Sequence, residues 1–184
     1  DGRLLATSVP EYDVRMDMVP DALTDERFKA SIDSLAACLA ALFQDRTVSE
    51  YKRDLVDARA RRERYHLVKR RATHAQVQAL RAFPIFRDGR YKGGLVTEKR
   101  LVRARPCERL AARTVGYVLR DSTVIGLEGG YNDWLKGRTG RRLERRLAGG
   151  TWMPVDNGEG TGPEPGSDIH TTIDINLQDV ADAA

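Results

Sequence analysis

A run of glycine and proline near the carboxyl end divides this chain more sharply than any other feature. Residues 156–166 hold four Gly and two Pro in eleven positions, a composition typical of a loop or linker. From Asp156 onward there are seven Asp and Glu and no Lys or Arg, although the whole chain has 31 Lys and Arg against 27 Asp and Glu. The sequence therefore predicts a basic body over residues 1–155, a linker over 156–166 and a short acidic segment over 167–184.

The composition is typical of a folded protein. Apolar residues make up 41% and charged residues 32% of the 184 positions, which argues against a disordered chain and predicts one domain or one domain plus a piece. No stretch approaches the ~20 apolar residues of a membrane-spanning helix. Cys38 and Cys107 are too few for a disulfide framework, so we expect unpaired thiols, or a bridge in an oxidising compartment. The chain stops within a predicted helix, and we expect it to be a fragment.

Hydrophobic periodicity predicts a mixture of helices and short strands. Apolar residues at spacings of three and four over 28–42 predict an amphipathic helix. Two further helices are expected to begin at capping boxes, Thr47 to Glu50 and Thr73 to Gln76. Strands are predicted at 12–18, 65–68 and 94–103 and on both sides of a Gly-Gly turn at 149–150, a turn is predicted at 88–89, and short helices are predicted at 110–115 and 127–135. The predicted fold class is α+β, with mixed helices and short antiparallel strands or hairpins, and not a doubly wound sheet.

No group of residues in the sequence completes an active site. Ser49 and Lys52 have the Ser-Xaa-Xaa-Lys spacing in which a lysine activates a serine for acyl transfer, but Ser49 also lies in the first turn of a predicted helix. Neither a Lys-Thr-Gly nor a Ser-Xaa-Asn pattern accompanies it. The histidines, His66, His74 and His170, lack partners at metal-ligand spacing, and the glycines form no phosphate loop. We therefore expect no catalytic, cofactor-binding or metal-binding residue in this chain.

Basic residues form two clusters. Seven Lys and Arg occur between Arg59 and Arg71, and residues 141–146 contain four Arg. Such clusters are typical of nucleic-acid binding, but Tyr65 is nearly the only aromatic residue among them, so no platform for stacking bases is evident. The clusters are also typical of solvated faces, of salt bridges to the many carboxylates, and of a surface for an anionic lipid or polymer. A basic nucleic-acid-binding α+β domain is the alternative function that these clusters leave open.

Four blocks of the sequence resemble the N-terminal pedestal, or dimerisation, domain of class B penicillin-binding proteins. The first, residues 1–14, opens with Asp-Gly-Arg-Leu-Leu-Ala; the second is residues 105–116, and the third, 126–140, opens with Gly-Leu-Glu. The fourth, residues 166–178, contains Thr-Ile-Asp and is similar to the opening of the family's transpeptidase domain. The blocks follow the family's order, with the linker at the position of its domain joint. Within the family, the chain looks most like the septal transpeptidases of Bacteroidetes.

The resemblance implies a non-compact pedestal module over residues 1–155, joined by the linker at 156–166 to the truncated start of a transpeptidase domain at 167–184. The parent would be a penicillin-sensitive D,D-transpeptidase that cross-links peptidoglycan in cell-wall synthesis and division, using a serine outside this chain. The implied partners are the parent's own transpeptidase domain, the glycosyltransferase and other division proteins, and a second copy of the chain. The resemblance implies that the chain binds neither nucleic acid nor a cofactor. The implied location is the periplasm, with the parent anchored to the inner membrane by an N-terminal helix outside this chain.

The residues that carry the resemblance are expected to be structural. They are Gly2, Arg3, Arg105, Pro106, Gly116, Gly126, Glu128, Gly137 and Gly140. The glycines of the second and third blocks are expected where the backbone needs positive φ or close approach. The first three blocks are expected to converge. Glu128 is then a half-buried carboxylate that pairs with Arg3, Arg105 or Arg113, because an unpaired buried charge is costly; the alternative is a first-turn residue that the helix dipole favours.

Overall fold

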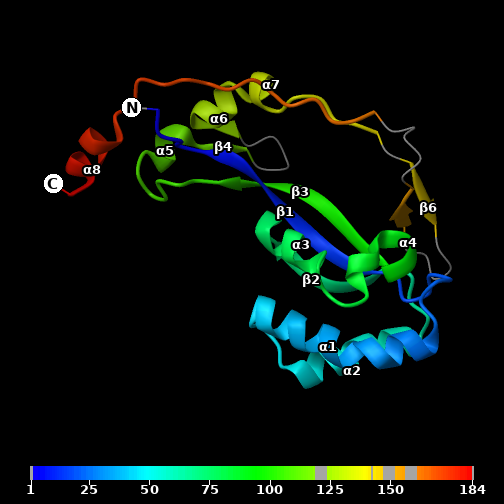
Figure 1. The fold of residues 1–184 in the computed structure, drawn as a ribbon. Coiled ribbons are helices and arrows are strands. Elements are labelled where there is room, and N and C mark those ends of the chain that lie inside the picture. Colours follow the sequence, from blue (N-terminus) through cyan, green and yellow to red (C-terminus); the bar gives the residue numbers. More distant parts are fainter. Residues whose placement is uncertain (1, 119–123, 142, 147–151, 156–160, 184) are drawn as a thin grey trace. The chain divides into compact units, whose positions relative to one another are not determined.

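The computed structural model describes residues 2–118, 124–141, 143–146, 152–155 and 161–183. The chain forms two compact units. The helical unit comprises Pro10–Val102, and the motif unit comprises Asp1–Val9 together with Arg103–Ala184. The chain passes between them inside two strands, β1 (Thr7–Met16) and β3 (Leu95–Ala104), so each of these strands contributes residues to both units (Figure 1).

A three-stranded sheet and two long helices build the helical unit. The sheet has the strand order β2-β1-β3, and β2 (His66–Ala72) is antiparallel to β1, with irregular pairing on either side of Val14. Two helices, α1 (Asp25–Phe43) and α2 (Val48–Ala60), lie side by side on one face of the sheet (Figure 1). Three short helices follow: α3 (His74–Leu80), the 3₁₀ helix η1 (Phe86–Asp88) and α4 (Gly89–Gly93).

Local sequence explains where the helices begin. The Thr24 hydroxyl caps α1 by accepting a hydrogen bond from the Arg27 N–H at 3.3 Å. The capping box predicted at α2 is present: the Glu50 N–H donates to the Thr47 hydroxyl at 3.3 Å, and the Thr47 N–H donates to the Glu50 carboxylate at 2.8 Å. The box predicted at Thr73 is also present, at the start of α3. Each box satisfies N–H groups that a helix start otherwise leaves without a partner.

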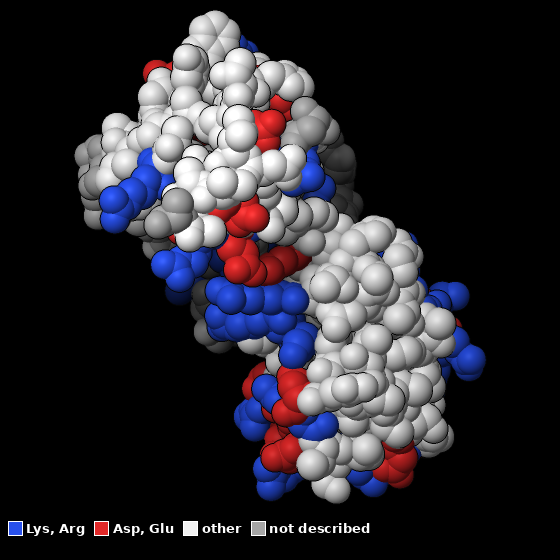
Figure 2. Space-filling model, turned by 90° about the vertical axis from the view of Figure 1, so that its left-hand side faces the viewer, with Lys and Arg blue, Asp and Glu red and all other residues white. Residues whose placement is uncertain are grey.

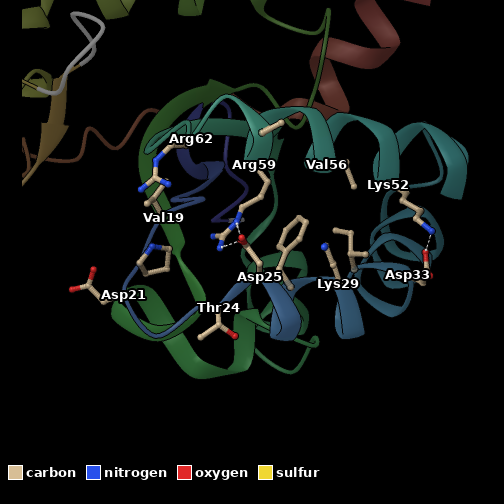
Figure 3. A pocket seen from close by; sticks show the side chains of 14 residues that line it. Val19, Asp21, Thr24, Asp25, Lys29, Asp33, Lys52, Val56, Arg59 and Arg62 are labelled. Carbon is tan, nitrogen blue, oxygen red and sulfur yellow. Dashed lines mark hydrogen bonds and ion pairs between the residues drawn. The ribbon is translucent and has the colours of Figure 1, made fainter.

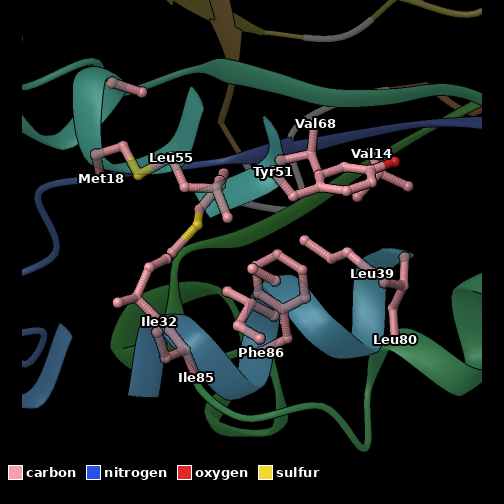
Figure 4. Close-up of a cluster of buried hydrophobic side chains, with 14 of the residues drawn as sticks. Val14, Met18, Ile32, Leu39, Tyr51, Leu55, Val68, Leu80, Ile85 and Phe86 are labelled. Atoms are coloured by element: carbon pink, nitrogen blue, oxygen red, sulfur yellow. The ribbon is translucent and has the colours of Figure 1, made fainter. Parts of the chain in front are cut away.

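One apolar core joins the helices of this unit to its sheet (Figure 4). Val14 of β1 and Val68 of β2 face Ile32 and Leu39 of α1 and Leu55 of α2, and all five side chains are buried. The α1 residues have the three-and-four spacing that the sequence shows. Burying one aliphatic side chain of this size contributes about 1.5–3 kcal/mol, so the core holds the helix pair against the sheet.

Short elements build the motif unit. They are α5 (Ala112–Val115), β4 (Tyr117–Val118), β5 (Val124–Ile125), α6 (Gly126–Gly130), α7 (Asn132–Leu135), β6 (Glu144–Arg146), β7 (Trp152–Pro154) and α8 (Ile175–Ala183). The strands β4 and β5 pair antiparallel, as do β6 and β7. The helix α6 packs against α5, α7 and both β4 and β5. The predicted fold class is confirmed: helices accompany small sheets, and the described residues contain no doubly wound sheet.

One local prediction was wrong: the helix predicted at 127–135 is divided at Tyr131, whose backbone (φ −109°, ψ 18°) is not helical, into α6 and α7. The turn predicted at 88–89 falls at the junction of two short helices, η1 and α4. The strands predicted at 141–148 and 151–155 are present as β6 and β7, which pair antiparallel, and the Gly-Gly turn between them lies outside the described residues. Within the described ranges, every helix is too short or too polar to cross a membrane.

Candidate functional site

The glycines of the second and third blocks lie against each other in the motif unit. Gly116 ends α5 with a φ of 73°, and Gly126 begins α6 with a φ of 66°. A Cβ atom at Gly116 would fall on the carbonyl oxygen of Ile125, and one at Gly126 would lie 2.8 Å from the Gly116 Cα atom. Both the positive φ and the close approach exclude a side chain here, so the two blocks are packed backbone to backbone, as the sequence predicts for these glycines.

Two arginines connect the same region. The Arg105 guanidinium donates to the carbonyl oxygen of Gly116, which ties the start of the second block to its end. The Arg103 Nε atom donates to the Glu128 carboxylate at 2.8 Å, and the Glu128 side chain is only 12% exposed. The prediction that Glu128 is half-buried and paired with an arginine is therefore confirmed, but the predicted partners, Arg3, Arg105 and Arg113, were wrong. Arg103 fills this role, and it stands two residues before Arg105, a spacing that brings side chains to one side of an extended chain.

The third block also holds the segment that follows the predicted linker. Backbone hydrogen bonds of 3.0 Å join the Arg138 N–H to the Glu164 carbonyl and the Glu164 N–H to the Arg138 carbonyl. The Arg141 N–H donates to the Thr161 carbonyl at 2.9 Å, and the Ser167 N–H donates to the Trp134 carbonyl at 2.8 Å. Residues 161–167 therefore lie alongside residues 134–141 as an extended, hydrogen-bonded segment.

Three glycines make this alignment possible. Gly137 has a φ of 61°, and a Cβ atom there would lie 2.7 Å from the Gly166 nitrogen. A Cβ atom at Gly140 would lie 2.6 Å from the Pro163 nitrogen, and one at Gly166 would fall on the Leu135 carbonyl oxygen. The third and fourth blocks are therefore in backbone contact along this segment.

The first block contacts the second and the fourth. The Arg3 guanidinium donates to the Asn176 side-chain oxygen at 3.0 Å, and the Cys107 Sγ atom lies 3.7 Å from the Leu4 carbonyl oxygen. Gly2 has a φ of 72° and open space around it, and Pro106 is exposed. The structure thus brings residues 1–9 of the first block into one unit with the other three blocks, while the functional role of these residues remains a prediction.

The Ser-Xaa-Xaa-Lys pair does not form a nucleophilic site. Ser49 is exposed in the first turn of α2, and the Lys52 ammonium pairs with the Asp33 carboxylate of α1. Two of the histidines have protein partners: His66 lies between Glu63 and Asp54, and His74 lies beside Tyr12. Among the described residues, no group of three or more His, Cys, Asp and Glu side chains is arranged to hold a metal ion.

A groove of about 790 Å³ lies between α1 and α2 on the helical unit (Figure 3). Phe28, Ile32 and Val56 line it, and the ion pair of Arg59 with Asp25, 2.6 Å long, borders it. The hydrogen bond from Arg59 holds the pKa of Asp25 below its usual value. Apolar side chains surrounded by ion-paired charges are typical of a surface that contacts another protein.

The basic residues of the first cluster are mostly engaged within the protein. Arg61 pairs with Glu63 at 2.6 Å, Lys69 pairs with Asp45 at 2.6 Å, and Arg59 pairs with Asp25. Figure 2 shows Lys and Arg side chains interspersed with Asp and Glu side chains on the face that it draws. This arrangement favours internal salt bridges over a continuous surface for nucleic acid as the role of the cluster.

The chain is similar to known proteins in both sequence and structure. The sequence profile of the penicillin-binding protein dimerisation domain matches residues 1–171. Penicillin Binding Protein 2X from Streptococcus thermophilus is similar in structure over 100% of this chain and 28% of its own, with 19% identity and a TM-score of 0.72. A peptidoglycan synthetase from Bifidobacterium adolescentis is similar over 99% of this chain and 35% of its own, with 21% identity and a TM-score of 0.54. A search of curated proteins gave no match.

A third solved structure, the complex between PBP2 and MreC from Helicobacter pylori, is 18% identical over 98% of this chain and 35% of its own, with a TM-score of 0.48. The chain thus spans between 28% and 35% of the length of these solved proteins. At these identities the structural similarity shows the fold alone, and the narrower resemblance to septal members of Bacteroidetes remains a prediction. Because the family profile covers nearly the whole sequence, the chain belongs to the penicillin-binding protein dimerisation domain family.

Proposed function

We propose that this chain is the non-catalytic N-terminal module of a peptidoglycan D,D-transpeptidase and that its motif unit positions the transpeptidase domain. The family assignment supports a non-catalytic role, because the dimerisation domain is separate from the domain that forms the acyl-enzyme. The observation that carries the positioning role is the backbone pairing of residues 161–167 with residues 134–141. The fourth block, which resembles the opening of the transpeptidase domain, begins at the end of this paired segment.

The physical argument concerns stiffness. A free segment rich in glycine samples many directions and would leave a following domain loosely tethered. Here four backbone hydrogen bonds and three close glycine contacts fix the segment, so the position and direction in which the chain continues are fixed as well. The ion pair of Arg103 with Glu128 and the packing of Gly116 on Gly126 stabilise the rest of the motif unit, to which this segment is bonded.

We place the module in the periplasm, in a parent that a membrane helix anchors to the inner membrane, and we propose contacts with the glycosyltransferase, with division proteins and with a second copy. Two described surfaces support contacts with other proteins. One is the groove between α1 and α2. The other is the β4–β5 hairpin, where Tyr117, Val118, Val124 and Ile125 are all exposed; exposed apolar side chains that adjoin one another are typical of contact surfaces.

The positioning role is tested in the longer protein. A flexible Gly-Ser segment of about six residues inserted after Gly166 leaves the catalytic domain unchanged but releases it from the paired segment. We expect acylation by a fluorescent penicillin within about twofold of the parent, together with loss of peptidoglycan cross-linking in cells. The same insertion after Gln44, an exposed residue between α1 and α2, is the control and should retain cross-linking. Full cross-linking with the Gly166 insertion would contradict the positioning role.

The non-catalytic assignment has its own test. The isolated chain is expected to take no covalent label from a fluorescent penicillin, because Lys52 is paired with Asp33 and no second catalytic group accompanies Ser49 among the described residues. Label on Ser49, lost in Ser49→Ala, would overturn this assignment.

A further inference from the structure

The second basic cluster, residues 141–146, lies on β6 and the segment just before it (Figure 1). Its backbone is held by hydrogen bonds: the Arg141 N–H donates to Thr161 at 2.9 Å, and the Val155 N–H donates to the Leu143 carbonyl at 3.0 Å. The following residues pair antiparallel with β7. A hydrogen-bonded framework in the motif unit therefore carries this cluster.

The charges of this cluster are open to solvent, unlike most of those in the first cluster at residues 59–71. The side chains of Arg141, Arg145 and Arg146 are exposed, and among the described carboxylates none forms an ion pair with them. Glu144, the acidic residue inside the cluster, is half-buried. An excess of positive charge is therefore available to an anion outside the protein.

An exposed apolar side chain lies among these cations. Leu143 is 51% exposed, and it stands two residues before Arg145 in the paired backbone, so the two side chains share one face of the hairpin. A leucine gains free energy by leaving water for an apolar medium. Neither a glycan nor a phosphate backbone offers such a medium, whereas the boundary between lipid headgroups and acyl chains does.

The arginines fit the phosphate groups of lipids. A planar guanidinium group donates two parallel hydrogen bonds to a phosphate, and this geometry favours arginine over lysine at such contacts. Nucleic acid also offers phosphates, but proteins that bind its single strands stack bases on aromatic side chains. Residues 141–146 contain no aromatic residue, so the cluster fits a lipid surface better than a nucleic acid.

The proposed membrane anchor would bring this cluster to a bilayer. Residues 1–9 belong to the same compact unit as β6, and the anchor helix proposed for the parent precedes residue 1. A tether raises the effective concentration of a second binding group near the membrane, so a weak contact is enough to hold it there. A basic patch is a common second attachment beside a hydrophobic anchor.

We propose that Arg141, Leu143, Arg145 and Arg146 form a membrane patch that binds anionic phospholipid headgroups, with Leu143 entering the acyl-chain boundary. One anchor leaves a unit free to rotate above the bilayer, and a second contact restricts this rotation. The patch would thereby orient the motif unit, and with it the chain that leaves this unit. This inference rests on the proposed membrane anchor and deepens the proposed positioning role.

Cosedimentation of the chain with lipid vesicles tests the membrane patch. We expect binding to phosphatidylcholine vesicles that contain phosphatidylglycerol and not to pure phosphatidylcholine, and weaker binding as salt is added. The double variant Arg145→Gln/Arg146→Gln should bind the anionic vesicles about twentyfold more weakly. The matched control, Arg53→Gln/Arg70→Gln, removes two exposed charges from the helical unit and should bind within about twofold of wild type. Equal weakening in both double variants would overturn the patch.

The leucine distinguishes a lipid surface from a polyanion. Leu143→Ser keeps every charge, and we expect it to weaken binding to anionic vesicles about tenfold while leaving binding to duplex DNA unchanged. If Leu143→Ser bound the vesicles as tightly as wild type, and wild type bound duplex DNA as tightly as the vesicles, the cluster would be a site for polyanions in general. That result would overturn the assignment to lipid.

Tryptophan fluorescence locates the contact. Both tryptophans, Trp134 and Trp152, belong to the motif unit, and Trp152 of β7 is in register with Arg146. In Trp134→Phe, the tryptophan signal comes from Trp152 alone, and we expect anionic vesicles with brominated acyl chains to quench it. Vesicle binding without quenching would overturn the patch. The positioning role would survive either failure, because the insertion after Gly166 tests it separately.

Discussion

At the scale of single residues, the motif unit depends on one ion pair and on glycines that admit no side chain. The glycines were predictable from their places at expected turns and helix ends, because positive φ is a local property of the chain. The arginine that pairs with Glu128 was not, since three candidates along the chain could each have served. Choosing Arg103 requires knowing which extended segment lies beside α6, which is decided by tertiary packing.

Replacing Glu128 by glutamine removes the charge that Arg103 binds and keeps the side-chain shape. Because Glu128 is mostly buried, we expect Glu128→Gln to lower the free energy of unfolding of the motif unit by about 1–3 kcal/mol. Urea unfolding followed by tryptophan fluorescence measures this. The control is Asp133→Asn, whose ion pair with Lys136 is exposed and contributes at most about 1 kcal/mol. Equal losses in the two variants would show that the ion pair of Arg103 with Glu128 stabilises the motif unit no more than an exposed ion pair does.

Gly116→Ala tests the close approach of two blocks. The added methyl group meets the Ile125 carbonyl at a backbone with positive φ, so we expect a loss of about 2 kcal/mol or more in the unfolding free energy of the motif unit. Gly130→Ala adds the same methyl group where nothing lies within 4 Å, and we expect a change of less than about 1 kcal/mol. If the unfolding free energy of Gly116→Ala equalled that of wild type, this result would contradict the close packing of Gly116 on Gly126.

At the scale of elements, the long helices and the helix starts at Thr47 and Thr73 follow from local sequence, whereas most short elements of the motif unit do not. The spacing of Phe28, Ile32 and Leu39 and the capping box at Thr47 predict α1 and the start of α2, because both signals lie within a few helical turns. The elements β4, β5, α6 and α7 span two to five residues each. Periodicity cannot be recognised over such short lengths, and their form depends on contacts among them.

The cap of α2 gives a prediction for one element. Thr47→Ala removes the hydroxyl that accepts from the Glu50 N–H, and we expect the helical unit to lose about 1 kcal/mol of unfolding free energy, measured by urea unfolding and circular dichroism. Ser49→Ala, two residues further and exposed, is the matched control with little change. A larger loss from Ser49→Ala than from Thr47→Ala would contradict the assigned cap.

The contacts of Asp45 with α2 and β2 predict that the helical unit loses stability in acid. Burial raises the pKa of Asp45, but hydrogen bonds from Lys69 at 2.6 Å and Tyr51 at 2.7 Å outweigh it and hold the pKa below its usual value. The stabilisation is therefore present above about pH 4 and is lost as pH falls through the lowered pKa. We expect urea midpoints of the helical unit to fall below about pH 4, and to fall less in Asp45→Asn. An equally acid-sensitive Asp45→Asn protein would exclude this carboxylate as a source.

At the scale of the whole molecule, the sequence indicated the family but not the division into units. Composition placed a boundary at 156–166, and that division into domains stays a prediction. The boundaries between the two compact units along the chain instead fall within β1 and β3. Composition does not change at those points, because one strand supplies residues to both units, and only the pairing of distant segments reveals the division.

The backbone pairing of residues 161–167 is the central claim, and hydrogen exchange tests it most directly. The Glu164 and Ser167 amides donate to Arg138 and Trp134, so in the folded chain they are expected to exchange slowly, and more slowly than the amide of the nearby exposed His170. Gly137→Ala, which places a methyl group against this segment, should speed both. Exchange of Glu164 and Ser167 at the rate of an unstructured peptide would contradict the account, because the chain would then leave the unit as a free tether.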